Sequence, residues 1–202
     1  YLGTGVFSGC SALESATLSE NLTLIPSGTF SGCKLLSSIT IPDSVTEIGF
    51  RAFSQCEALK SIVLPKNVTS IQYEIFDRCS ALESVTFECD LTQIPDKAFY
   101  GCTALNSVTI PGGVTTISDQ TFYNCSGLDN ITVMEGVKTI GNNAFQNCTS
   151  LKYLILPEGI TSIGKLGISG CRALVCIQLP KSLTTVGDSA FNLSNNLKHV
   201  AY

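Results

Sequence analysis

The 202-residue sequence lacks tryptophan, has a single histidine (His199), and only 14% of its residues are charged. General acid-base catalysis relies mostly on histidine and paired carboxylates, and metal sites need clustered His, Cys or acidic side chains. We therefore expect no enzyme, no metal and no cofactor. The net charge of −4 supplies no basic field for a phosphate backbone, which argues against nucleic acid as a partner.

Long apolar runs are also absent. No stretch approaches the roughly 18 consecutive apolar residues that cross a bilayer, so we expect no direct membrane insertion. Residues 1–10 lack the charged segment and apolar stretch of a signal peptide. The chain is nevertheless 44% hydrophobic, which is enough to bury a core and argues against disorder.

Cysteine, in contrast, is abundant and periodic. Eight of the ten cysteines recur every 23 residues without an insertion or deletion, at Cys10, Cys33, Cys56, Cys79, Cys102, Cys125, Cys148 and Cys171. Leucine and phenylalanine keep the same interval, with Ile168 in the place of one phenylalanine. Three residue types in one register identify a tandem repeat. We predict a single domain over residues 1–202 with about nine turns. Because Gly3 starts within a unit and Tyr202 falls at an inward strand position, we expect a segment of a longer array.

Each unit follows the pattern LxxIxLPxxVTxIGxxAFxxCxx. Ile62 and Leu64 lie two residues apart, the period of a strand with one buried face, and Pro65 ends that strand. Val68 and Ile71 are expected to point inward from a second extended piece. The apolar residues that follow recur about every three positions, which predicts one turn of 3₁₀ or α-helix. The fold expected is an α/β-type solenoid of mostly short parallel strands.

At this point the units LKSIVLPKNVTSIQYEIFDRCSA and LKYLILPEGITSIGKLGISGCRA resemble the BspA-type leucine-rich repeat, a class found in surface proteins of bacteria and some protozoa. Other leucine-rich repeats have a leucine at the position that Thr69 occupies in this chain. Here the apolar residue stands one position earlier, at Val68. The resemblance implies a right-handed superhelix with a parallel sheet on its concave side. It also implies a non-enzymatic role in adhesion or partner binding, located outside the cell or at its surface.

The periodic cysteines predict a buried column of free thiols, because each occupies an apolar place in a uniform environment. Disulfides between adjacent turns are not excluded by strand spacing alone. Cys89 lies in a corner and is expected to be partly exposed. Cys176 occupies an outward strand position, one turn before His199, so a nucleophile and base pair is conceivable, but no orienting carboxylate accompanies it.

Function is expected on the outward strand positions, where the sequence is free to vary. The first five turns present mainly Ser and Thr, whereas the later turns present residues that favour binding hot spots. The predicted binding residues on the concave face are Tyr153, Ile155, Gln178, His199, Cys176, Asn130 and Thr132.

The expected partner is a protein or a glycan, such as a host matrix or cell-surface molecule. The sequence also allows two alternatives. In the first, the chain is a passive spacer that holds another domain away from a surface. In the second, it is an intracellular scaffold, because cysteines stay reduced inside the cell.

Overall fold

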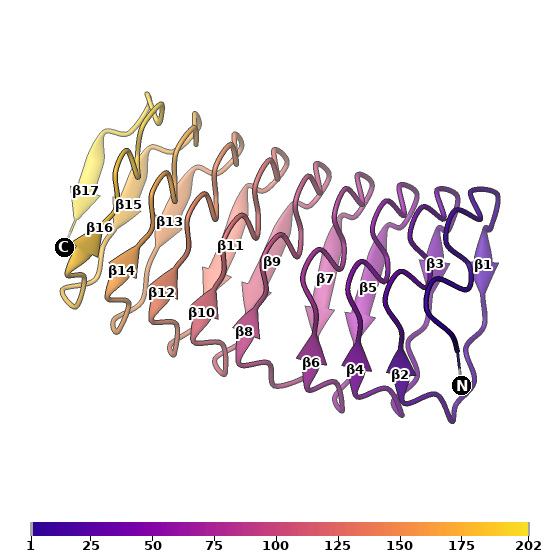
Figure 1. The fold of residues 1–202 in the computed structure, drawn as a ribbon. Helices are drawn as coiled ribbons and strands as arrows, with labels where there is room; N and C mark the ends of the chain where they lie inside the picture. The colour runs from indigo at the N-terminus through magenta and orange to yellow at the C-terminus, as the bar shows by residue number, and fades with distance from the viewer. Residues whose placement is uncertain (1, 202) are drawn as a thin grey trace.

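The computed structural model describes residues 2–201, so the expected inward position of Tyr202 lies outside the described residues. Within that range the chain forms seventeen short β-strands, β1 to β17, and no helix. The strands stack turn upon turn from one end of the molecule to the other (Figure 1). The predicted solenoid is confirmed, whereas the predicted 3₁₀ or α-helical turns are wrong.

The odd-numbered strands form one face of the solenoid, which we call the odd-strand face. Every pairing is parallel, and each residue pairs with its counterpart 23 positions later, as Ile62 does with Val85. These strands are β1 (Ser15–Ala16), β3 (Ser38–Ile39), β5 (Ser61–Leu64), β7 (Ser84–Phe87), β9 (Ser107–Ile110), β11 (Asn130–Val133), β13 (Tyr153–Ile155), β15 (Cys176–Gln178) and β17 (His199–Ala201).

The even-numbered strands form the opposite wall, which we call the even-strand face and which is turned toward the viewer in Figure 1. Each of them has two residues. They are β2 (Leu24–Ile25), β4 (Glu47–Ile48), β6 (Ser70–Ile71), β8 (Gln93–Ile94), β10 (Thr116–Ile117), β12 (Thr139–Ile140), β14 (Ser162–Ile163) and β16 (Thr185–Val186).

The two walls enclose a continuous hydrophobic core. Ile62 and Leu64 of β5 are buried, whereas Ser61 and Val63 between them are exposed, which is the alternation expected of a strand with one inner face. Val68 is likewise buried. A unit of this length buries its apolar side chains only against neighbouring units, so the stacking of turns is what stabilises the fold.

The segment after each even strand consists of successive β-turns. In one unit the N–H of Ala52 donates to the Gly49 carbonyl and that of Cys56 donates to the Phe53 carbonyl, while the N–H groups of Phe53 and Gln55 bond to the next unit. The third residues of these two turns, Arg51 and Gln55, have positive φ of 52° and 58°. Left-handed residues and bonds between units prevent the run of local bonds that a helix requires.

A ladder of phenylalanine rings fills the core beside these turns. The rings stack from Phe7 to Phe145 with centroids of adjacent rings 5.3 to 5.7 Å apart. Ile168 takes the next place and is fully buried. Offset stacking adds to the free energy gained from burial, so the ladder couples each turn to the next.

The cysteines lie where the sequence predicts them, except for Cys10 of the column and Cys89 of the corner. All ten are free thiols, and the column is buried from Cys33 to Cys171. Cys10 is exposed because the first turn is covered on one side only. Cys89 is only 3% exposed, contrary to expectation. Glu88 stands where most other units have proline, and the chain bends at Cys89 so that its side chain turns inward.

Candidate functional site

The outward residues of β13, β15 and β17 form one continuous surface on the odd-strand face. Tyr153 and Ile155 are 63% and 64% exposed. Strand register places Cys176 between Tyr153 and His199 and aligns Gln178 with Ile155. The structure therefore brings these five predicted residues together, and we call them the β13–β17 patch.

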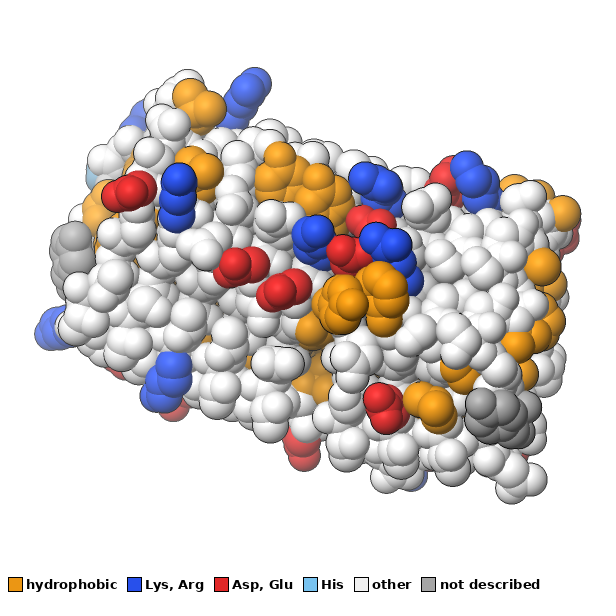
Figure 2. Space-filling view, viewed as in Figure 1, with side chains coloured by type: hydrophobic (Ala, Val, Ile, Leu, Met, Phe, Trp, Pro, Cys, Tyr) orange, Lys and Arg blue, Asp and Glu red, His pale blue; other side chains and the backbone are white. Residues whose placement is uncertain are grey.

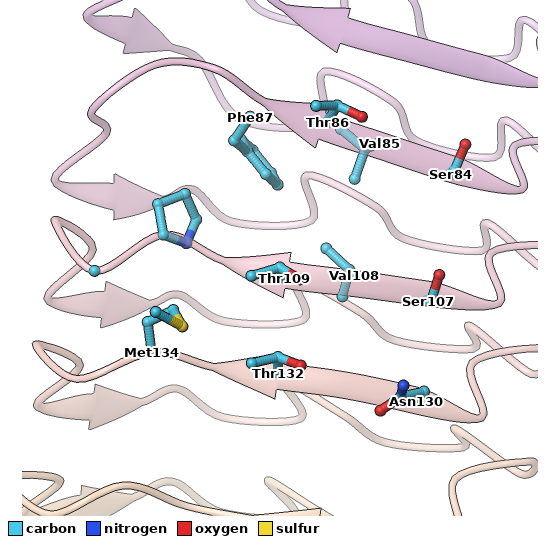
Figure 3. A pocket seen from close by; sticks show the side chains of 12 residues that line it. Ser84, Val85, Thr86, Phe87, Ser107, Val108, Thr109, Asn130, Thr132 and Met134 are labelled. Carbon is cyan, nitrogen blue, oxygen red and sulfur yellow. The ribbon is translucent and has the colours of Figure 1, made fainter.

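The other two predicted residues lie on the neighbouring strand. Asn130 and Thr132 are exposed on β11, which packs beside β13. They line a shallow hollow of about 470 Å³ that spans β7, β9 and β11. Figure 3 shows Thr86, Thr109 and Thr132 in one column of this hollow, with Met134 at its edge. The hollow is thus rich in hydroxyl groups and lies next to the β13–β17 patch.

A second hollow of about 560 Å³ lies over β1, β3 and β5 on the same face. Its outward side chains include Ser15, Ser38, Ser61 and Thr40. Small hydroxyl side chains bury little area on contact, so these turns offer weaker anchors than Tyr153 does.

Cys176 and His199 are direct neighbours by strand register, as the sequence suggested. Cys176 is half-buried and His199 is exposed. Among residues 2–201, no side-chain hydrogen bond or ion pair orients the His199 imidazole. The pair therefore lacks the third group that activates a nucleophile in a triad.

A second cluster, which sequence reasoning did not identify, lies where the β-turns meet the even-strand face. Glu74 accepts a hydrogen bond from Nε of Arg51 and another from Nζ of Lys97, at 3.3 Å. Burial alone would raise the pKa of Glu74, but the hydrogen bonds and charges of Arg51 and Lys97 outweigh burial and bring this pKa below its usual value. Burial raises the pKa of Asp77, which accepts a hydrogen bond from Ser54.

Aromatic side chains flank these charges. The Phe50 and Tyr73 ring centroids are 4.3 Å apart, and Tyr100 stacks on Tyr123 at 4.8 Å. The Arg78 guanidinium lies over the Tyr100 ring, 5.9 Å from its centroid. We call the cluster the turn-edge patch, made of Arg51, Arg78, Lys97, Tyr73, Tyr100 and Tyr123 around Glu74 and Asp77.

Figure 2 shows basic, acidic and hydrophobic side chains gathered near the middle of this face, amid largely uncharged surface. The sequence does carry a signal for this patch. Tyr100 and Tyr123 replace a place in the unit that is serine in the first three units, Ser8, Ser31 and Ser54.

Two further properties hold for residues 2–201. They contain no helix with the length and apolarity needed to cross a membrane. No cluster of three or more His, Cys, Asp or Glu side chains within them is arranged to hold a metal ion.

Several solved leucine-rich repeat structures have the same fold. A leucine-rich repeat protein from Bacteroides ovatus is 35% identical, with a TM-score of 0.88 over 97% of this chain and 50% of that one. One from Eubacterium ventriosum is 29% identical, with a TM-score of 0.69 over 89% of this chain and 42% of that one. A leucine rich cell surface protein from Faecalibacterium prausnitzii is 28% identical, with a TM-score of 0.56 over 98% and 62%. This chain thus spans less than two thirds of the length of each.

Among the curated proteins, no relative is found. The family described as BspA type Leucine rich repeat region matches residues 1–129 and 115–202, which together cover the whole chain. The 23-residue unit, the parallel solenoid and these matches agree. The chain belongs to the BspA-type leucine-rich repeat family.

Proposed function

We propose that this chain is a non-enzymatic binding module of a cell-surface protein, which holds a protein or glycan through the β13–β17 patch. The observation that carries the proposal is the exposure of Tyr153 and Ile155 side by side on β13. An aromatic and an aliphatic side chain on one strand offer area that a partner can desolvate. Aromatic anchors of this kind dominate the free energy of binding in most interfaces.

The surroundings of these two residues suit the same role. Gln178 and His199 supply directional hydrogen bonds beside the apolar anchors, as at the rim of an interface. Asn130 and Thr132 extend the polar margin into the hydroxyl-lined hollow. Two adjoining parallel sheets, one ending at β11 and the other starting at β13, hold these side chains on a rigid surface, which lowers the entropy lost on binding.

A surface location is supported by the family and by the relative from Faecalibacterium prausnitzii, which is described as a cell surface protein. A host matrix protein or a host glycan is then the partner class to examine first. Binding of this kind needs neither a cofactor nor a metal.

The test is a binding screen of this chain against immobilised matrix proteins and glycans. For any ligand found, Tyr153→Ala with His199→Ala should weaken binding by more than about 1 kcal/mol. The control pair Ser38→Ala with Ser61→Ala lies on the same face and should leave the affinity nearly unchanged. If the serine pair proves the more sensitive, the β13–β17 patch is the wrong site. If no ligand is found on either face, the role of a passive spacer is favoured.

A further inference from the structure

The fold does not require charged or aromatic residues at the positions that form the turn-edge patch. The place of Arg78 in its unit is held by Gln55 one turn earlier, and the place of Lys97 is held by Gln120 one turn later. Gln55 and Gln120 also have positive φ, of 58° and 56°. The repeat therefore folds with neutral side chains at both places, and the cations in the patch need another explanation.

The backbone at these places makes the same point. Arg51, Arg78 and Lys97 have φ of 52°, 56° and 53°, in the left-handed region that glycine adopts most readily. Earlier units do have glycine there, for example Gly28 and Gly32. Neutral residues of other units, such as Leu166 and Leu193, have the same conformation at these places. The left-handed backbone is therefore a property of the repeat, and the fold does not require a cation there.

The charges of the patch are not fully neutralised within residues 2–201. Glu74 is bonded to two of the cations, Arg51 and Lys97. Arg78 forms no ion pair with a carboxylate within 4.0 Å and instead lies over the ring of Tyr100. Arg51 uses only its Nε toward Glu74, which leaves its terminal nitrogens available. Three cations surround two carboxylates, so an additional anion would balance the patch.

The shape of the patch fits one anionic group. A cavity of about 160 Å³ is lined by the three cations, by the two carboxylates of Glu74 and Asp77, and by Tyr100 and Gln120. Because Glu74 is already bonded to Arg51 and Lys97, the cation without a carboxylate partner in this lining is Arg78. Tyr73, 48% exposed, and the half-buried pair Tyr100 and Tyr123 offer aromatic surface beside it. Arginine and tyrosine are the residues most enriched at the centres of protein interfaces.

We propose that the turn-edge patch is a second binding surface, which docks a protein segment carrying an aspartate or glutamate side chain. The carboxylate enters the cavity between Arg51 and Arg78, where a guanidinium binds it with two parallel hydrogen bonds. Neighbouring apolar atoms of the segment pack on Tyr73 and Tyr100. A single carboxylate suits the patch better than a polyanion does, because the chain as a whole is negatively charged.

This surface lies on a different wall from the β13–β17 patch, so each of the two proposed binding surfaces can be tested independently of the other. The probe is a library of short random peptides displayed on phage and panned against the protein. Recovered sequences should be enriched in Asp and Glu. Each recovered peptide is then synthesised in its acidic form and in the matched Asn or Gln form, and affinities are measured by fluorescence polarisation. The acidic form should bind at least about fivefold more tightly, and raising NaCl from about 0.05 M to about 0.5 M should weaken it.

The variants follow from the repeat itself. Arg78→Gln introduces the residue that the preceding unit holds at this place, Gln55, and Tyr100→Ser introduces the residue that the first three units hold, so both variants should fold, and thermal melting checks this. Each should weaken the acidic peptide at least about fivefold. Lys165→Gln removes an exposed cation outside the patch, and Tyr153→Ala alters the other face, so both should keep the affinity within about twofold.

Recovery of peptides without acidic enrichment would overturn the proposal. So would an Arg78→Gln variant that binds the acidic peptide as well as the parent protein does. Binding of uronate oligosaccharides at Arg78, with no peptide recovered, would overturn the assignment of a protein partner.

Discussion

The thiol of Cys56 donates a hydrogen bond to the backbone carbonyl of Phe30, with Sγ 3.3 Å from the oxygen. The same bond recurs one unit at a time from Cys33 to Cys171. In the last unit Ser194 holds the cysteine place, and its Oγ donates to the Ile168 carbonyl at 3.1 Å. The place therefore requires a small side chain that donates a hydrogen bond, which explains why the thiols do not pair with one another.

The cysteine column predicts a clear division in thiol reactivity. Burial raises the pKa of each column thiol from Cys33 to Cys171, to about 11 for Cys33 and about 12 for Cys171. Because the thiolate is the reactive form, buried thiols should be inert toward a bulky reagent. Only Cys10 and Cys176 should react in the native protein.

The measurement is titration with a bulky aromatic disulfide before and after denaturation. Eight further thiols should appear on unfolding, because eight cysteines are buried. Native reaction at Cys89 would show that its corner opens. An intact mass that reveals disulfides between adjacent turns would contradict the free-thiol column.

The phenylalanine ladder predicts unequal costs along the core. Phe99 is fully buried between two stacked rings, so Phe99→Ala should lower the free energy of unfolding by about 3 to 5 kcal/mol. Ile168→Phe would extend the ladder beyond Phe145 and should be neutral or stabilising. Urea denaturation measures both changes.

Local mobility should follow the same order. Gly167 precedes Ile168 where several other units have alanine, and glycine adds backbone freedom. Amide hydrogen exchange should therefore be faster around Ile168 than around Phe99. Equal protection of the two segments would contradict this interpretation of the interrupted ladder.

The left-handed positions predict the effect of exchanging glycine with other residues. Gln55 and Gly32 hold the same place in adjacent units, with φ of 58° and 75°. Gln55→Gly removes a left-handed cost of about 1 to 2 kcal/mol but loses about 0.5 to 1 kcal/mol of backbone entropy, so a gain of up to about 1.5 kcal/mol is expected. Gly32→Ala should cost about 1 kcal/mol, because its new methyl group has space but its φ is strained. A loss of stability in Gln55→Gly would contradict this account.

Much of the fold can be predicted from the sequence, because the constant 23-residue interval fixes which residues of adjacent units pair. The inward positions of Ile62 and Leu64, the proline corner and the buried thiols are all set by residue types that recur in unit after unit. The sequence predicts helical turns where the structure has β-turns, because apolar residues spaced about three apart fit both structures. What decides between them is the bonding of alternate N–H groups to the next unit, which a single unit does not reveal.

Of the two candidate sites, one could be predicted from the sequence and the other could not. The β13–β17 patch could be predicted as a group because strand register follows from the repeat, so Tyr153, Cys176 and His199 had to be neighbours. The turn-edge patch could not be predicted as a group. Its tyrosines depart from the repeat pattern, but its side chains extend from β-turns that the sequence pattern predicts to be helical. The burial of Cys89 could not be predicted either. The unit with Met134 also lacks proline at the place of Glu88, yet its next residue, Glu135, is exposed.

Asp77 and Glu74 predict opposite dependences of stability on pH. Burial raises the pKa of Asp77 above its ordinary value of 3.8, so the folded state holds this proton more tightly than the unfolded state does. Stability therefore falls as pH rises from 3.8 through the folded pKa, and above it the buried charge is a full cost. Glu74 has a pKa below its ordinary 4.5, so its contribution is present above 4.5 and is lost as pH falls through the folded pKa.

The isosteric variants Asp77→Asn and Glu74→Gln separate these two effects. Asparagine keeps an acceptor for Ser54 and removes the buried charge, so Asp77→Asn should stabilise the protein at neutral pH. Glu74→Gln weakens the bonds to Arg51 and Lys97 and should destabilise it there. Urea unfolding at pH 7 and near pH 3 measures the difference from the parent protein, which should shrink for both variants at the lower pH because the protonated fraction of both carboxyls rises as pH falls. If Asp77→Asn destabilises the protein at pH 7, the carboxylate is better compensated by Arg78 than its burial suggests, and the sign assigned to it is wrong.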